Sequence, residues 1–232
     1  MTPRTSDQAL AAVTSALLQD HDVMGLLAQL VHDSAHFVPV DAAGLLLRTE
    51  DDRLEFLSAT SHRTTELELY QAQGDEGPCV DVVAERSSVE VVGASAIEER
   101  WPQVGPEIVR AGFQAVFAFP LRWHERAIGG LNLFATRPEP LGEDARHLAQ
   151  TFADVCALVI VQPQHVDESD LLGNLRRALE GRVVVEQAKG VLAHQLGIDM
   201  AAAYDELVRR SERDELSLTA TAAATVAEAH RR

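Results

Sequence analysis

Basic residues near the C-terminus are the clearest candidates for chemistry in this sequence. Lys189 is the only lysine of the chain, and Arg182 lies seven residues before it. Seven residues are two turns of a helix, so both cations are expected on one face, where they could contact an anionic partner. Gly190 follows, and a glycine inside a helix costs about 1 kcal/mol relative to alanine. It indicates either close approach of a ligand to the backbone or tight packing of a neighbouring helix.

The remaining reactive side chains form no recognisable catalytic or metal-binding pattern. Cys79 and Cys156 lack metal-ligand spacing and are expected to be reduced thiols. His32 and His36 lie four residues apart, but no third ligand is apparent near them. No Ser/His/Asp set, phosphate loop or metal quartet stands out. We therefore expect no enzyme activity, no metal and no cofactor.

Charge is divided unevenly along the 232 residues. The net charge is −16, yet residues 171–232 hold equal numbers of basic and acidic residues, so the negative charge lies in residues 1–170. A long acidic part repels polyanions, whereas a balanced segment can sort its charges onto opposite faces. No apolar run is long enough to span a membrane, and the N-terminus is unlike a signal peptide. We expect a cytoplasmic protein with no membrane contact.

Hydrophobic periodicity predicts an α+β fold, a sheet flanked by helices, over residues 6–162. Its expected elements are a helix at residues 6–31, strands at Ala42–Arg48, Leu54–Ala59, Val89–Val92, Ala115–Leu121 and Ile128–Thr136, and a helix at Gly142–Val161. Residues 163–170, which include Pro163, form a polar linker. Residues 171–232 are expected to be all-α, with three helices that end near residue 196, Arg213 and Ala229.

An apolar stripe marks the first half of the first of these three helices. It consists of Leu171, Leu172, Leu175 and Leu179. We expect it to form the seam of a coiled-coil homodimer. The alternative is packing against the preceding domain of the same chain.

The C-terminal segment, residues 171–232, resembles an ANTAR domain, the RNA-binding module of bacterial transcription antitermination regulators. The resemblance rests on Arg182, Val184, Val185, Ala188, Lys189, Gly190 and Leu192, then Ala203, Tyr204 and Leu207, and finally Leu218 and Ala222. Ala193 departs from the pattern, because methionine is common at that position.

The resemblance implies an RNA-binding surface that combines phosphate contacts, base-edge readout and stacking. Its candidate residues are Arg182, Gln187, Lys189, Gly190, Tyr204, Arg209, Arg210 and Arg213. For Tyr204 the alternative is a half-buried core position, and for the three later arginines it is an ordinary solvated face.

Residues 6–162 resemble a GAF domain. The resemblance rests on Gly77-Pro78-Cys79, Arg100-Trp101-Pro102, Phe119-Pro120-Leu121 and Gly129-Gly130-Leu131-Asn132-Leu133. GAF domains are similar to small-molecule receptors, so it implies a ligand pocket between the sheet and the irregular residues 60–110. Its candidate lining is Cys79, Trp101, Phe117, Phe119 and Asn132. The alternatives are plain core for the two phenylalanines and a buried, unreactive position for Cys79.

A chain that resembles both domains implies an antitermination regulator. A homodimer would present two tails to paired hairpin loops in nascent RNA, prevent terminator formation and respond to a small molecule at the GAF domain. The alternative is a GAF small-molecule sensor whose helical tail binds a protein partner.

Overall fold

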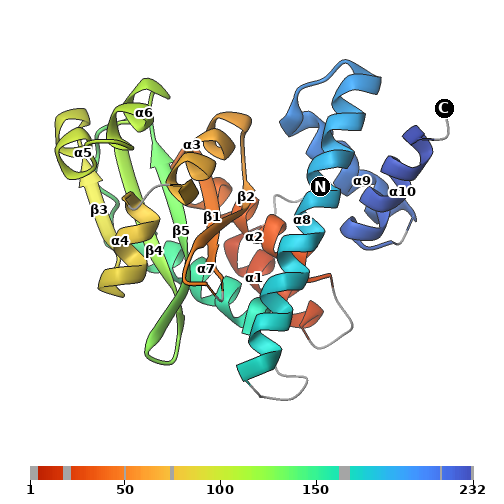
Figure 1. Ribbon diagram of the computed structural model, residues 1–232, viewed down its shortest axis with the longest axis horizontal. Helices are drawn as coiled ribbons and strands as arrows, with labels where there is room; N and C mark the ends of the chain where they lie inside the picture. The colour runs from red at the N-terminus through yellow and green to blue at the C-terminus, as the bar shows by residue number, and fades with distance from the viewer. Residues whose placement is uncertain are drawn as a thin grey trace.

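One five-stranded antiparallel sheet, covered by helices on both faces, forms the larger part of the molecule (Figure 1). The computed structural model describes residues 5–17, 22–49, 51–73, 76–161, 168–214 and 216–230. Three C-terminal helices lie beside one edge of the sheet. The predicted α+β fold followed by a helical tail is therefore confirmed.

The strands follow the order β2-β1-β5-β4-β3. They are β1 (Ala42–Arg48), β2 (Leu54–Ala59), β3 (Val89–Val92), β4 (Ala115–Trp123) and β5 (Arg126–Ala135). Each predicted strand is present, with small differences at its ends. β1, β4 and β5 are buried along most of their length, because helices cover both faces of the sheet.

Successive residues of a strand point to opposite faces, so the sheet contributes to two hydrophobic clusters. On one face, Leu45, Phe117 and Leu131 pack with α2 and α7. On the other, Val116 and Phe134 pack with the short helices α3 to α6. The helices of this part are α1 (Ser6–Ala16), α2 (Val23–Phe37), α3 (His62–Gln73), α4 (Pro78–Glu85), α5 (Ala94–Arg100), α6 (Gly105–Arg110) and α7 (Glu143–Val161).

The prediction of a single helix over residues 6–31 is wrong. Two helices, α1 and α2, occupy this region, and residues 18–21 between them lie outside the described residues. Thr5 and Gln8 form a capping box at the start of α1. Asp22 has an extended backbone, with φ −82° and ψ 102°, and precedes the first turn of α2. Apolar spacing continues across the break, so periodicity alone could not reveal it.

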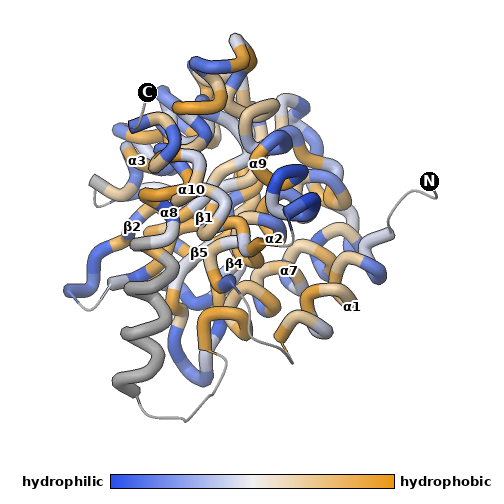
Figure 2. The backbone as a smooth tube through the Cα atoms, turned by 90° about the vertical axis from the view of Figure 1, so that its right-hand side faces the viewer, coloured by the Kyte–Doolittle hydropathy of each residue, from blue (hydrophilic) through white to orange (hydrophobic). Residues whose placement is uncertain are grey.

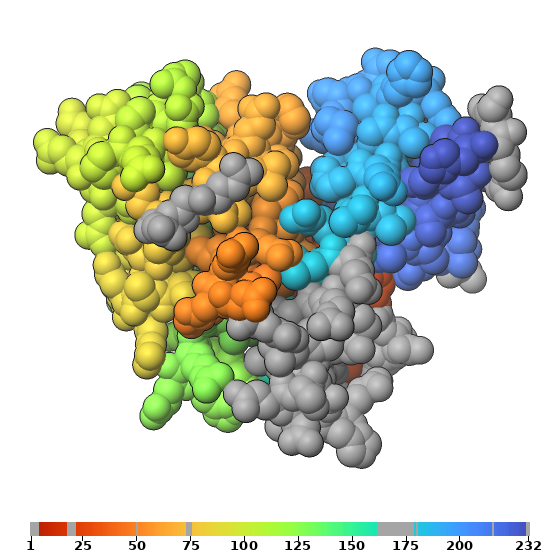
Figure 3. All heavy atoms as spheres, in the orientation of Figure 1, coloured from red at the N-terminus to blue at the C-terminus, as the bar shows by residue number. Residues whose placement is uncertain are grey.

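The tail packs directly on the sheet domain. It comprises α8 (Glu168–Leu196), α9 (Met200–Asp214) and α10 (Leu218–His230). α8 contacts α2, α7 and the edge strand β2, and α10 contacts α2. In Figure 3 the cyan residues of α8 meet the orange residues of the β2 and α3 region. Among the described residues, no helix is apolar over a length that could cross a membrane.

A single hydrophobic cluster runs through both parts of the chain. Val185, Ala188 and Leu192 of α8 belong to the same cluster as Leu27 of α2 and Phe152 of α7. Figure 2 shows mostly hydrophobic colours around α2 and the central strands, and a strongly hydrophilic stretch at α9. The tail therefore shares its core with the sheet domain.

Gly181 permits the close packing of α8 against α2. A β-carbon on Gly181 would lie 2.8 Å from Cβ of Met24 on α2, an atom that cannot move without its backbone. We expect Gly181→Ala to lower the free energy of unfolding by about 1–3 kcal/mol, because the added methyl group overpacks the interface. Chemical denaturation of the full chain measures this change.

Gly190→Ala on the same helix is the matched control. A β-carbon there would meet nothing within 4 Å. This variant should gain about 0.5–1 kcal/mol from helix propensity alone. Equal stabilisation by the two substitutions would contradict the observed packing of α8.

Candidate nucleic-acid interface and sensor cluster

Arg182 lies against the edge strand β2. Its guanidinium group donates a hydrogen bond to the carbonyl oxygen of Phe56 and lies over the Phe56 ring, 5.2 Å from the ring centroid. An edge strand leaves carbonyl groups without a partner strand, and an arginine can satisfy one of them. Arg182, which the resemblance to an ANTAR domain makes a candidate for RNA binding, is thus held by the chain's own sheet.

Lys189 is covered as well. Only 7% of the residue is exposed, and its ammonium group lies 2.8 and 3.1 Å from the two carboxylate oxygens of Glu186. It lines a narrow pocket at the junction of the two parts together with Ser61 and Thr65 from the start of α3. Arg182 and Lys189 therefore share one face of α8, as their spacing predicts, and that face is turned toward the sheet domain.

Tyr204 of α9 is more buried than a half-buried core position. It is 5% exposed, and its ring stacks on His32 of α2 with centroids 4.3 Å apart and an interplanar angle of 1°. Burial raises the pKa of the Tyr204 hydroxyl above its usual range and lowers the pKa of His32 to about 4. His32 is therefore neutral near pH 7, and the pair contributes an uncharged contact between the two parts.

Asp22 joins α2 to α10 through its carboxylate. It accepts hydrogen bonds from the backbone amide of Thr219 at 2.7 Å and from the Thr219 hydroxyl at 2.7 and 2.8 Å. These bonds satisfy an amide in the first turn of α10, where a negative charge also complements the helix dipole. A residue of the sheet domain thus caps a helix of the tail.

Other candidate residues of α8 face away from the sheet domain. Gln187 and Gly190 are exposed, and a β-carbon on Gly190 would have open space around it. Packing of a neighbouring helix from the described part of this chain therefore does not account for the glycine. The backbone at this point is accessible to a partner that approaches closely.

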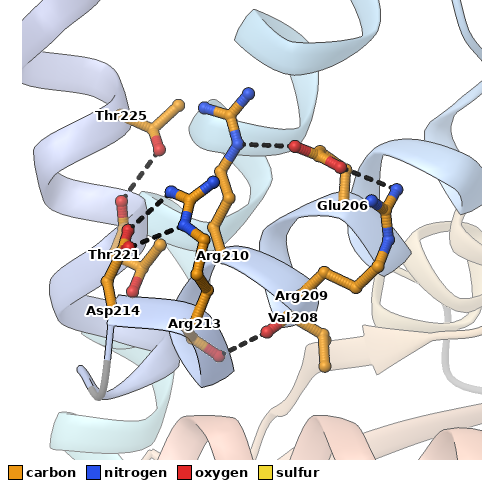
Figure 4. Close-up of polar contacts among 9 residues, drawn as sticks. Glu206, Val208, Arg209, Arg210, Arg213, Asp214, Thr221 and Thr225 are labelled. Carbon is orange, nitrogen blue, oxygen red and sulfur yellow. Dashed lines mark hydrogen bonds and ion pairs between the residues drawn. The ribbon is translucent and has the colours of Figure 1, made fainter.

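The three later arginines, Arg209, Arg210 and Arg213, pair with acidic residues of their own helix α9 (Figure 4). Glu206 accepts from Arg210 at 2.7 Å and pairs with Arg209 at 2.6 Å, while Arg213 forms two bonds of 2.7 and 2.8 Å to Asp214. Hydrogen bonding to these arginines lowers the pKa of both carboxyl groups. Arg209 and Arg213 are mostly exposed, and exposed ion pairs contribute little to stability. Phosphate groups could replace these carboxylates at small cost.

A second group of polar side chains is buried beneath α3. Glu68 is fully buried, and its carboxyl oxygens accept from Asn132 Nδ2 at 2.9 and 3.0 Å and from Gln71 Nε2 at 2.8 Å. Gln71 in turn accepts from the amide of Cys79. Burial raises the pKa of Glu68 to about 8. Burial and the neighbouring Glu68 also raise the pKa of the Cys79 thiol, which is therefore not a reactive thiolate.

The predicted ligand-pocket residues do not all meet at this cluster. Cys79 and Asn132 do, whereas Phe117 and Phe119 lie in the hydrophobic cluster on the opposite face of the sheet. Alternation along β4 explains the difference, because Ala118 is the cross-strand partner of Asn132. Trp101 packs on the α3 side, and its indole nitrogen donates to Asp81 at 3.1 Å.

Sequence analysis missed Glu68 and Gln71, and it also missed Asp22 and Phe56 as contacts of the tail. Glu68 and Gln71 are three residues apart on one helix face, next to the apolar Leu67, and this spacing was a usable signal. No local pattern marks Asp22 or Phe56, because their partners lie far away in the sequence.

The predicted dimer seam falls mainly on side chains that lie outside the described residues, namely Leu171, Leu172 and Leu175. Leu179 is half-buried and packs against the hydrophobic cluster of its own chain. For Leu179, packing within the chain is therefore what the structure shows.

The fold and its two polar sites define a two-part protein in which a sheet domain holds a helical tail. A family model of the GAF domain matches residues 22–160, and one of the ANTAR domain matches residues 173–226. The chain belongs to the GAF domain family and carries an ANTAR domain after its GAF domain. No curated protein matches the sequence.

Several solved structures are similar to the GAF part. The GAF domain of an Acinetobacter phosphoenolpyruvate-protein phosphotransferase has a TM-score of 0.51 and 17% identity, over 69% of this chain and 95% of that one. Its counterpart from Coxiella burnetii has a TM-score of 0.51 and 16% identity, over 67% and 92%. Free methionine-R-sulfoxide reductase from Neisseria meningitidis has a TM-score of 0.50 and 15% identity, over 75% and 91%. At these identities the likeness concerns the fold alone.

The buried Glu68 predicts a dependence of stability on pH. Its pKa is raised in the folded state, so the folded protein binds more protons than the unfolded chain between about pH 4.5 and 8, and stability falls as pH rises through this range. Glu68→Gln removes this titration. We expect the variant to gain stability relative to wild type between pH 5 and 8, by several kcal/mol, as measured by urea denaturation.

Glu66→Gln on the exposed side of α3 is the control and should follow the wild-type pH profile. Parallel profiles of wild type and Glu68→Gln would show that Glu68 is not a buried acid.

Proposed function

We propose that this protein is an RNA-binding regulator of transcription antitermination, and that its GAF domain controls access to the ANTAR tail. The observation that carries the proposal is the open backbone at Gly190, within an ANTAR match that covers residues 173–226. A mid-helix glycine against which no described residue of its own chain packs lowers helix stability without a compensating packing contact. Close approach of an RNA backbone to the helix would account for a glycine at this position.

The candidate RNA contacts fall into two sets that differ in accessibility. Gln187, Gly190, Arg209 and Arg213 are exposed in the docked arrangement, whereas Arg182, Lys189 and Tyr204 contact or face the sheet domain. Arg210 belongs to neither set, because it is half-buried and paired with Glu206. The exposed set can meet RNA first. Full binding requires the covered set, and therefore requires the tail to leave the sheet domain.

This arrangement supports a resting state in which the GAF domain competes with RNA. Phe56 offers Arg182 a carbonyl acceptor and an aromatic face, which are also the two features that a nucleobase offers. A released tail in a homodimer would present two such surfaces to paired hairpin loops. Two weak contacts on one body gain affinity through their effective concentration. Holding these loops would prevent an overlapping terminator hairpin from forming.

Binding to an RNA with two adjacent hairpin loops tests the function. We expect binding of the full chain to weaken as salt increases, because phosphate contacts release counterions. Lys189→Ala should lower the affinity and reduce the slope of log K against log salt by about one. Gly190→Gln should also lower the affinity, because its side chain blocks approach to the backbone. Fluorescence anisotropy with labelled RNA measures all three.

Arg137→Ala is the matched control, since it removes an equally positive but distant and exposed side chain. It should leave both affinity and salt slope unchanged. Wild-type binding that survives Lys189→Ala and Gly190→Gln unaltered would reject this RNA surface, and a protein partner for the tail would then be the better proposal.

Weakening the contact between Asp22 and Thr219 tests the control by docking. Asp22→Ala and Thr219→Val each remove the side-chain bonds from one side of the junction and leave every candidate RNA residue intact. Hydrogen bonds to a charged group contribute about 1.5–3 kcal/mol, so the docked state should lose enough population to raise RNA affinity by roughly tenfold or more. The same anisotropy measurement applies.

Thr151→Val on α7 serves as the control, because the Thr151 hydroxyl donates to the carbonyl oxygen of His147 in its own helix. If Lys189→Ala weakens RNA binding but neither junction variant changes the RNA affinity, docking does not inhibit binding.

A further inference from the structure

A buried acid without a cation is the feature of the GAF domain that the proposed function leaves unexplained. Glu68 is fully buried, and among the described residues no basic side chain pairs with it. Its neighbours are the amides of Asn132 and Gln71 and the thiol of Cys79. A buried carboxyl group is costly unless a positive partner or several hydrogen bonds compensate for it.

Two glycines on the central strands leave space for the Glu68 carboxyl group and the side chains around it. Gly44 on β1 is the cross-strand partner of Asn132 on β5, and a β-carbon on Gly44 would collide with the Glu68 carboxyl group. A β-carbon on Gly130 would similarly lie 2.7 Å from the Cys79 sulfur. Two glycines in the central strands thus create a recess over the sheet, and polar side chains occupy it.

The recess contains one acceptor that has no hydrogen-bond partner among the described residues. Asn132 is fully buried, and its Oδ1 atom has no hydrogen-bond partner in the described structure. Asn132 Nδ2 and Gln71 Nε2 already donate to Glu68. A group that donates a hydrogen bond would satisfy Asn132 Oδ1, and a positive charge on it would compensate the carboxylate.

Helix α3 is the cover of the recess. It packs on β1 and β2, exposes Leu69 and Tyr70 on its outer side, and is tied to the end of α6 by the bond from Arg63 to the carbonyl oxygen of Ala111. Because Glu68 and Gln71 belong to α3, a displacement of this helix away from β1 would withdraw both side chains and open the recess toward solvent.

We propose that the recess beneath α3 binds the primary ammonium group of a small organic molecule, with the Glu68 carboxylate as counter-ion and Asn132 Oδ1 as a second acceptor. Binding displaces the proton of Glu68 to solvent and shifts α3 outward. The start of α3, at Ser61 and Thr65, lines the junction pocket beside Lys189, so this shift also loosens the docked tail. The link to the tail rests on the proposed function, whereas the ammonium site does not.

The test uses the full chain with ethylammonium and ethanolammonium chloride at constant ionic strength. Tetramethylammonium chloride, which has the charge but no N–H donor, is the comparison salt. We expect the two primary ammonium salts to raise Tm by about 3–5 °C for each tenfold increase in concentration above Kd, because they bind only the folded state. Calorimetric titration at pH 7 in two buffers with different ionisation enthalpies should report release of about one proton for each ammonium bound.

Glu68→Gln should abolish both the Tm shift and the proton release, and Glu66→Gln on the exposed face of the same helix should keep both. The proposal is overturned by equal stabilisation with tetramethylammonium, by an unaltered response of Glu68→Gln, or by the absence of any primary-ammonium effect. These readouts need no RNA, so failure of the ammonium site and failure of RNA binding remain distinguishable.

Discussion

The packing of α8 against the sheet domain is the interaction on which the rest of this structure depends. A three-helix tail buries little apolar surface by itself, and small units of this kind need additional surface to be stable. The sheet domain supplies it through α2, α7 and the edge strand β2, and the hydrophobic cluster is continuous across the boundary. The same packing covers Arg182 and Lys189. The packing that stabilises the tail therefore also covers its basic face. Any partner that binds Arg182 and Lys189 in place of the sheet domain must also replace the apolar contacts beside them.

Helix α3 lies between the two polar sites of the molecule. Its first residues line the junction pocket near Lys189, and its inner face places Glu68 over Gly44 at the centre of the sheet. A rigid helix that contacts both places transmits a displacement at one end to the other. Under the proposed mechanism, this arrangement would carry a displacement of α3 to the tail through direct side-chain packing.

Predictions from the sequence agree with the structure where an element depends on residues close together in the chain, and they disagree where it depends on residues far apart. Every predicted strand is present, because alternation, apolar runs and turn residues are local signals. The prediction of one helix over residues 6–31 was wrong because Asp22 adopts an extended backbone and caps α10, nearly two hundred residues away in the chain. Cys79 and Asn132 lie near one another, whereas Phe117 and Phe119, which the predicted pocket also included, lie on the other face of the sheet because residues alternate along β4. Burial of Tyr204 was underestimated, since its stacking partner His32 lies in another domain.

The sequence by itself determined the two domains, the order of their elements and the basic residues of α8, because these depend on periodicity and on residue types at short spacing. It also determined that Gly190 would stand out within a helix. Only the tertiary structure decided which residues are accessible: Gly190 faces open space among the described residues, Lys189 is covered, and the fully buried Glu68 lies over Gly44. Accessibility depends on which surfaces meet, and the surfaces that meet here come from opposite ends of the chain. Contacts of this kind leave no periodic trace in the residues that make them.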